Sequence, residues 1–309
     1  MIHNKTHSNK EIFEYHYFLV KDTFKIRYGI APCYEKPAKG IFLLLHGRSE
    51  FIEKYKWVAK QLQKKGFQVV SPDWRGQGLS SRELENRHKG HINRFDDYVD
   101  DLAALYLRVI EPQRLPVYIL AHSMGGHIAL RFMSRHPLKI KKAVLASPMI
   151  DITMPAIMKP VSKLLSKKLS KTQFAKKYTI GSGDYSVRKA KFKGNNLCHD
   201  LEKYRILHNE IANNPDLAIG GVTWGWLNAA FESIEVLKQD DIIAKISTPI
   251  LMISAQKDSI VSSKAQEKLS SKLPNCSFLS IKGAFHELFF EEIGINNQLW
   301  DAFNRFVVE

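Results

Sequence analysis

The sequence predicts an α/β protein with a mostly parallel sheet and a helical insertion. Short apolar runs, typical of buried strands, alternate with amphipathic helical patterns. The alternation stops after residue 149 and resumes from residue 236, which indicates a segment inserted between two strands of one sheet. Hydrophobic residues make up 44% of the 309 residues, enough for a large core, so disorder is excluded as the main state.

The first part of the chain, residues 1–149, repeats a strand-and-helix unit. The run 41–45 is apolar throughout, as expected of a strand buried on both faces. Basic residues followed by Gly66 form a helix stop signal. Strands are expected at residues 11–20, 24–31, 41–45, 67–70, 117–121 and 143–146, and helices at 55–64, 95–110 and 124–135.

The middle part, residues 150–235, contains helical patterns and loops but no convincing buried strand. The last part, residues 236–309, returns to the earlier alternation. Its expected strands are 250–254 and 277–281, and its expected helices are 263–272 and 296–306. We therefore expect a core built from both ends of the chain and a helical insertion between them.

Composition narrows the function classes. The net charge of +15 favours an anionic partner, either nucleic acid or anionic lipid. The three cysteines lie far apart without a C-x-x-C pair, which disfavours a disulfide framework or zinc site and favours a cytoplasmic protein. No apolar run reaches the roughly 18 residues of a spanning helix, and no secretory signal is expected. The histidines are scattered, so neither a metal nor another cofactor is expected.

The strongest motif surrounds Ser123. A buried strand runs into this serine and a helical pattern starts at Met124, which is the arrangement of a nucleophile elbow. The tight turn needs small residues two positions to either side, and Ala121 and Gly125 satisfy that need. The backbone N–H of Met124, at the helix N-terminus, is a predicted oxyanion donor.

A serine nucleophile needs a base and an orienting acid, which follow it in the order acid, then histidine. Of the histidines after Ser123, His199 and His208 fall in the insertion, whereas His286 follows the last predicted strand. Asp258 follows the strand 250–254 and would lie at the carboxyl edge of the sheet beside the His286 loop. The predicted triad is therefore Ser123, Asp258 and His286.

Two further loops lie at strand ends. Gly47 lets the loop after the strand 41–45 turn closely, and the N–H of Arg48 is the predicted second oxyanion donor; a plain turn is the alternative. His46 is expected to hold this loop. The glycine-bearing loop 73–80 lacks the G-K-[ST] ending of a phosphate loop, so we expect Asp73 or Arg75 to brace neighbouring loops.

Taken together, these motifs resemble the serine α/β-hydrolases of the lysophospholipase and monoacylglycerol lipase group, with features of bacterial lysophospholipases. The residues that carry the resemblance are His46-Gly47, Asp73-x-Arg75-Gly76-x-Gly78-x-Ser80, the run 95–102, His122-Ser123-Met124-Gly125-Gly126, Asp258 and His286. The resemblance implies an α/β-hydrolase fold, a helical lid over the site, and hydrolysis of single-chain lipid esters. Ala121 stands where many members have glycine.

The preferred expectation is a lysophospholipase that works through an acyl-enzyme on Ser123. A monoacylglycerol lipase or a general carboxylesterase is the alternative. A non-catalytic ligand-binding protein of the same fold is an alternative of another class, because fold alone does not establish activity. The presence of all three triad residues argues against it.

The positive charge concentrates in residues 151–193, which hold eleven Lys or Arg and two acids. Apolar residues share one arc of a helix: Ile157, Met158, Val161, Leu164, Leu165 and Leu169. Lys159, Lys163 and Lys167 fall opposite. This pattern predicts either docking on the anionic inner membrane face or a lid helix packed on the core with solvated lysines. Nucleic acid is not expected as a partner, because no recognition motif accompanies the charge.

Near the end of the insertion, Trp224, Trp226 and Leu227 form an apolar cluster. They are candidates for an acyl-binding pocket, since lipid sites are mostly apolar. Core packing is an equally good interpretation of the same residues.

Overall fold

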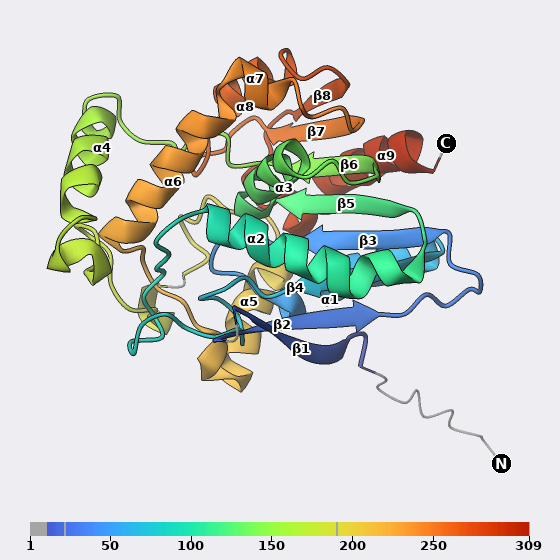
Figure 1. Cartoon of the computed structure of the whole chain (residues 1–309), viewed down its shortest axis with the longest axis horizontal. Coiled ribbons are helices and arrows are strands. Elements are labelled where there is room, and N and C mark those ends of the chain that lie inside the picture. The colour runs from blue at the N-terminus through green and yellow to red at the C-terminus, as the bar shows by residue number, and fades with distance from the viewer. Residues whose placement is uncertain (1–10, 22, 190, 309) are drawn as a thin grey trace.

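The computed structural model describes residues 11–21, 23–189 and 191–308 (Figure 1). Its centre is an eight-stranded sheet with the order β1-β2-β4-β3-β5-β6-β7-β8. The strands are β1 (Glu14–Val20), β2 (Phe24–Ala31), β3 (Gly40–Leu45), β4 (Phe67–Pro72), β5 (Val117–His122), β6 (Ile140–Ala146), β7 (Ile250–Ala255) and β8 (Cys276–Ile281). Every strand expected from the sequence is present, with bounds that differ by no more than a few residues.

The sheet is parallel except at one edge. β1 pairs antiparallel with β2, and β2 pairs antiparallel with β4. From β4 to β8 each neighbouring pair is parallel, so the carboxyl ends of these strands meet at one edge of the sheet. Loops at such an edge are where open α/β sheets bind their ligands.

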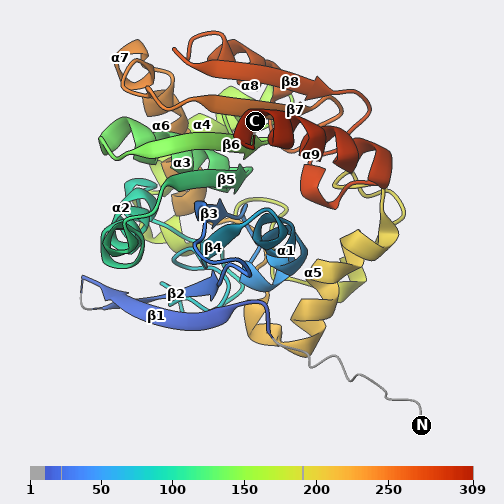
Figure 2. The same ribbon diagram turned by 90° about the vertical axis from the view of Figure 1, so that its right-hand side faces the viewer.

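Helices cover both faces of the sheet (Figure 2). On one face α1 (Lys56–Lys64) and α9 (Ile293–Val307) pack over a core that includes Phe42 and Leu44 of β3. On the other face lie α2 (Asp96–Leu105), α3 (Met124–Arg135), α7 (Asp240–Ile243) and α8 (Ser263–Ser270). The central strands are therefore buried on both sides, which explains their continuous apolar runs.

The segment between β6 and β7 contains three longer helices: α4 (Met158–Leu169), α5 (Leu201–Asn213) and α6 (Trp224–Leu237). No strand forms in its described residues. In Figure 1 the arrowheads of β3, β5 and β6 point toward α4 and α6, so this segment lies beyond the carboxyl edge of the sheet. α6 packs Ala229 and Ala230 into the main core and continues to Leu237, past the predicted boundary at 235.

Of the two interpretations of α4, the structure contradicts the one in which the whole apolar arc packs on the core. Four residues of that arc are exposed: Ile157 (88%), which directly precedes the helix, and Met158 (59%), Val161 (61%) and Leu164 (58%) within it. Two of the lysines expected in solvent turn toward the body instead. Lys159 pairs with Asp151 at 2.5 Å, and Lys163 pairs with Glu235 on α6 at 2.8 Å. A helical wheel places residues on an arc, but it does not say which arc faces the protein.

Only Leu165 and Leu169 of the predicted apolar arc pack inward, against Trp224, Leu227 and Phe231 of α6. Lys167 remains exposed, as expected. Among the described residues, no helix is both long enough and apolar enough to cross a membrane.

Candidate active site

Ser123 sits on a strained turn between β5 and α3. Its φ of 51° and ψ of −116° lie in a region that L-residues rarely adopt. The turn is held by neighbouring backbone: the Ser123 N–H donates to Ala146 at 3.0 Å, and its carbonyl accepts from Met149 at 2.9 Å. A short strand-to-helix turn of this kind projects the serine side chain from the end of the sheet.

The small residues of the motif are required by contacts with neighbouring strands. A Cβ at position 125 would lie 2.3 Å from the carbonyl oxygen of Leu45, at the end of β3. A Cβ at Gly126 would lie 2.7 Å from the Pro148 ring. Both glycines let α3 approach the sheet closely, which fixes the height of Ser123 above the strand ends.

The three residues of the predicted triad are in contact. His286 Nε2 lies 3.0 Å from Ser123 Oγ, and His286 Nδ1 lies 2.7 Å from Asp258 Oδ2. The other oxygen of Asp258 accepts from the backbone N–H groups of Ile260 and Val261, at 2.8 and 2.9 Å. Asp258 therefore both caps its own loop and orients the imidazole, with Nδ1–H directed to the carboxylate and Nε2 directed to the serine.

A small cavity of about 230 Å³ opens beside this chain of hydrogen bonds, and Arg48, Ser123 and His286 line it. In the described part of the chain, the backbone N–H groups of Arg48 and Met124 donate no hydrogen bond. Both predicted oxyanion donors are thus available to a bound group. Backbone N–H groups left unpaired inside a protein are rare, and a ligand is one way to satisfy them.

The loop that carries Arg48 is tightly held. Its Gly47 N–H donates to Glu50 Oε2 at 2.5 Å, and its Ser49 N–H donates to the Gln77 side chain at 2.6 Å. The buried His46 ring contacts the Gly47 carbonyl at 2.7 Å, as its predicted holding role requires. Burial lowers the pKa of His46, so the ring is neutral at pH 7.

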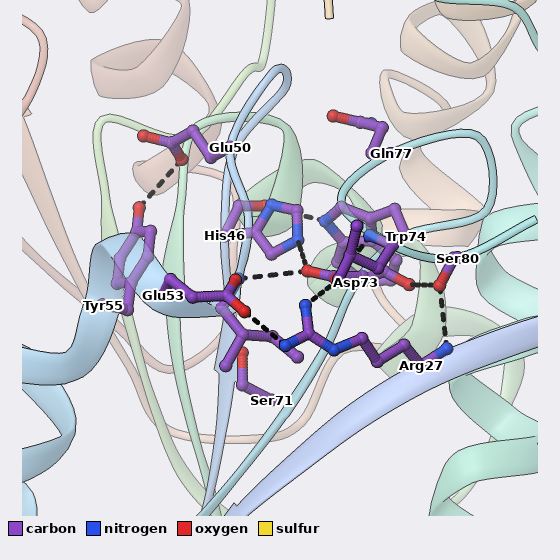
Figure 3. Close-up of polar contacts among 12 residues, drawn as sticks. Arg27, His46, Glu50, Glu53, Tyr55, Ser71, Asp73, Trp74, Gln77 and Ser80 are labelled. Carbon is purple, nitrogen blue, oxygen red and sulfur yellow. Dashed lines mark hydrogen bonds and ion pairs between the residues drawn. The ribbon is translucent and has the colours of Figure 1, made fainter. Parts of the chain in front are cut away.

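Asp73 forms hydrogen bonds that link the loop containing Arg48 to neighbouring segments at the sheet edge (Figure 3). One of its carboxylate oxygens accepts from the Ile52 N–H, and the other accepts from Arg27 and from the Leu79 N–H, all at 2.9 to 3.0 Å. Trp74 donates its indole N–H to the His46 carbonyl at 2.8 Å. The predicted bracing role of the loop 73–80 matches these contacts.

Arg75 links the same loop to α2. It forms two hydrogen bonds with Asp101 on α2, at 2.7 and 2.9 Å, in the paired geometry that suits guanidinium and carboxylate. Gly78 has a positive φ of 51°, and a Cβ there would overlap the Asp73 carboxylate. The glycines of this loop thus make room for Asp73 and not for a phosphate.

A buried polar cluster beside the site was not predicted from the sequence. Lys54 pairs with both Glu50 and Glu287, at 2.5 and 2.8 Å, and all three are buried. His122 contacts Glu50 at 3.2 Å and the His286 carbonyl at 3.3 Å, which links the cluster to the predicted base. Lys54 and His122 lower the pKa of Glu50, and Glu50 together with Glu287 raises the pKa of Lys54.

Nothing in the sequence predicts the pair between Lys54 and Glu287, because the two residues lie far apart along the chain. The pair between Lys54 and Glu50 could have been predicted from their spacing of four residues.

The predicted acyl contacts lie in apolar clusters. Trp226 packs edge-on against Phe95 in the main core, whereas Trp224 and Leu227 pack with Phe231 under α4. None of the three lines the cavity at Ser123. Their contact with substrate stays a prediction.

Comparison with known proteins identifies relatives of the whole chain. The family model described as serine aminopeptidase, S33 (Hydrolase_4) matches residues 36–293. Lysophospholipase L2 of Escherichia coli strain K12 is 33% identical over 282 residues, which cover 86% of this chain and 80% of that protein. Probable lysophospholipase L2 of Haemophilus influenzae is 30% identical over 298 residues, 96% of this chain and 93% of that protein.

Among solved structures, a soluble variant of monoglyceride lipase from Saccharomyces cerevisiae superposes with a TM-score of 0.75 at 17% identity and covers 96% of both chains. At that identity the likeness concerns the fold, which is that of the α/β-hydrolases. The chain therefore belongs to the serine aminopeptidase S33 family, within its lysophospholipase and monoacylglycerol lipase group, and it is a serine ester hydrolase.

Proposed function

We propose that the protein is a lysophospholipase in which Ser123 is the nucleophile, His286 the general base and Asp258 the orienting acid. The observation that carries this proposal is the unbroken hydrogen-bond chain from Asp258 through His286 to Ser123 on a strained elbow. Only a reaction that moves a proton from the serine needs all three features together.

In this mechanism Ser123 Oγ attacks the ester carbonyl while His286 Nε2 accepts the hydroxyl proton. Asp258 stabilises the imidazolium that forms. The N–H groups of Met124 and Arg48 bind the oxyanion of the tetrahedral intermediate. The intermediate collapses to an acyl-enzyme, and His286 protonates the leaving alkoxide. A water molecule, deprotonated by His286, then releases the fatty acid and restores Ser123.

The choice of substrate follows from the relatives. Two proteins that align with most of this chain are named as lysophospholipases, one of them as probable. Monoacylglycerol is the alternative, because it presents the same single-chain ester without a phosphate.

Initial rates on a lysophospholipid, a monoacylglycerol and a short soluble ester, each at the same concentration, test the proposal. A kcat/KM for monoacylglycerol above that for every lysophospholipid would contradict it.

We also propose that residues 150–235 form a lid that docks on a membrane through the exposed side of α4. Ile157, Met158, Val161 and Leu164 form an outward apolar ridge on this helix. The exposed Lys167, Lys168 and Lys171 stand at its end. An apolar ridge next to basic residues suits the interface of an anionic bilayer. Co-sedimentation with anionic and neutral vesicles measures this binding.

A further inference from the structure

A second cavity, of about 370 Å³, adjoins the cavity at Ser123. Leu197, Leu207 and Glu287 line both cavities, so the two spaces share a wall. The outer walls of the second cavity come from residues 181–186, from α5 and from residues 219–221. The second cavity therefore lies next to the space in which a substrate ester would meet Ser123.

The second cavity is acidic in a strongly basic protein. Asp184 and Glu287 line it, whereas no Lys or Arg is found among its described lining residues. Hydrogen bonds from Tyr178 and Asn86 lower the pKa of Asp184, so this carboxyl is ionised at neutral pH. In the described part of the chain, the lysine that pairs with Glu287 is Lys54, which also pairs with Glu50, so the two carboxylates share one positive charge.

Three aromatic rings complete the wall. Tyr185 and His208 stack with ring centroids 6.1 Å apart, and the Tyr185 hydroxyl lies 2.9 Å from His208 Nδ1. Tyr204 lies 5.0 Å from the same His208 ring. Burial lowers the pKa of His208, so its ring carries no positive charge at neutral pH. Aromatic faces combined with carboxylates bind alkylammonium cations.

We infer that this second cavity binds the ammonium group of a zwitterionic lysophospholipid, such as one with an ethanolamine or choline head group. The inference rests on the proposed function and assigns the head-group site for it. In such a lipid the phosphate lies between the glycerol ester and the ammonium, so it would lie where the two cavities meet.

Arg48 is the cation near that junction. Arg48 lines the Ser123 cavity, and its guanidinium donates to the carbonyl of Gly220, which borders the second cavity, at 3.0 Å. The guanidinium also lies 5.8 Å from the centre of the Trp226 ring, and no carboxylate among the described residues pairs with it. A guanidinium without a carboxylate partner, at the border of the second cavity, is suited to pair with the phosphate of the substrate.

The test compares substrates with one acyl chain and different head groups. We expect wild-type kcat/KM to be higher for lysophosphatidylethanolamine or lysophosphatidylcholine than for lysophosphatidylglycerol. Asp184→Asn keeps an acceptor for Tyr178 and Asn86 but removes the charge, and should lower this ratio by about three- to tenfold. Asp184→Lys should lower it further. Tyr185→Leu should lower it too, whereas Tyr185→Phe, which keeps the ring, should restore most of it.

Asp241→Asn on α7 is the matched control, because Asp241 is an exposed acid that lines neither cavity; it should leave the ratio unchanged. A ratio unaltered in both Asp184 variants, or equal losses on all substrates, would overturn the inference.

Binding of a non-hydrolysable ether-linked lysophosphatidylcholine, measured by calorimetry, separates this inference from the proposed function. One outcome is that the wild-type protein hydrolyses no lysophospholipid but binds the ether lipid more tightly than Asp184→Lys does. That result would refute the proposed function and support the head-group site. Equal affinity for wild type and Asp184→Lys refutes the site.

Discussion

The edge of the sheet and the helix α4 are held in opposite ways. At the sheet edge, Ser123, Gly125 and the Arg48 loop are fixed by buried backbone contacts and by a dense set of polar side chains. α4 meets the body through two leucines and through the ion pairs of Lys159 and Lys163, and it leaves most of its apolar residues in solvent.

The positions of side chains are therefore fixed closely at the sheet edge and much less closely on α4. A reaction centre needs accurately positioned atoms, and the Arg48 loop, the Ser123 backbone and the start of α3 are each held by the contacts described above. A helix that docks on a membrane, as proposed for α4, needs only its apolar face turned outward. Substitutions at the sheet edge should therefore lower activity or stability, and substitutions on the exposed side of α4 should lower neither.

The largest effect is expected at the proposed triad. Ser123→Ala and His286→Ala should each lower kcat by on the order of 10⁶-fold, because the residues act as a unit. Asp258→Asn should be less severe. Hydrolysis of a short ester, with circular dichroism as the folding control, measures this. Combining Ser123→Ala with His286→Ala should add little, and a Ser123→Ala enzyme that keeps more than a few per cent of activity would exclude Ser123 as nucleophile.

The next largest effect is expected at Lys54. Lys54→Met leaves Glu50 and Glu287 buried without their cation, which should lower the free energy of unfolding by about 3–5 kcal/mol. Urea unfolding at neutral pH measures this loss. Lys56→Met is the matched control, because its pair with Glu210 is partly exposed and should contribute no more than about 1 kcal/mol.

The same cluster predicts a pH dependence. The pKa of Glu50 is lower in the folded protein than its ordinary value, so its stabilising contribution is complete above that ordinary value of 4.5 and is lost as the pH falls below it. In Lys54→Met this contribution is already weakened. The difference in unfolding free energy between wild type and Lys54→Met should therefore shrink as the pH falls below 4.5. A difference that grows on acidification would contradict the assignment.

A smaller effect is expected at Gly125. Gly125→Ala forces a Cβ to within 2.3 Å of the Leu45 carbonyl oxygen, so α3 must shift away from β3. We expect a loss of about 1–3 kcal/mol in unfolding free energy and a lower kcat, because Ser123 moves with the helix. Gly294→Ala in α9, where a Cβ meets nothing within 4 Å, should be neutral or stabilising. Equal behaviour of the two variants would show that close packing at Gly125 is unimportant.

The smallest effect on the isolated enzyme is expected on α4. Val161→Ser with Leu164→Ser should weaken binding to anionic vesicles while the rate on a short soluble ester stays unchanged, since both side chains are exposed and neither lines the cavity at Ser123. Lys167→Ala should weaken binding by about fivefold, as expected for about 1 kcal/mol per exposed basic residue. Lys163→Ala, whose charge already pairs with Glu235, should weaken it less. Equal binding of wild type to neutral and anionic vesicles would refute the role of the lysines.

What the sequence predicted well is what local rules control. Each strand and the turn at Ser123 follow from apolar runs and small residues. Chain order and the positions of Asp258 and His286 after two of these strands then predicted that both lie near Ser123. The sequence left two interpretations of α4 open, because a helical wheel does not say which face meets the protein and the acids that pair with Lys159 and Lys163 lie outside the helix. The pairing of Lys54 with Glu287 was not predicted, because it exists only once the sheet is assembled.

The contact between Ser123 and His286 joins residues 163 positions apart, across the whole insertion. In the proposed mechanism, a chain that ends before β8 carries the nucleophile without its base. Ester hydrolysis should then begin only after β7 and β8 have joined the sheet, so activity would report that the fold is complete.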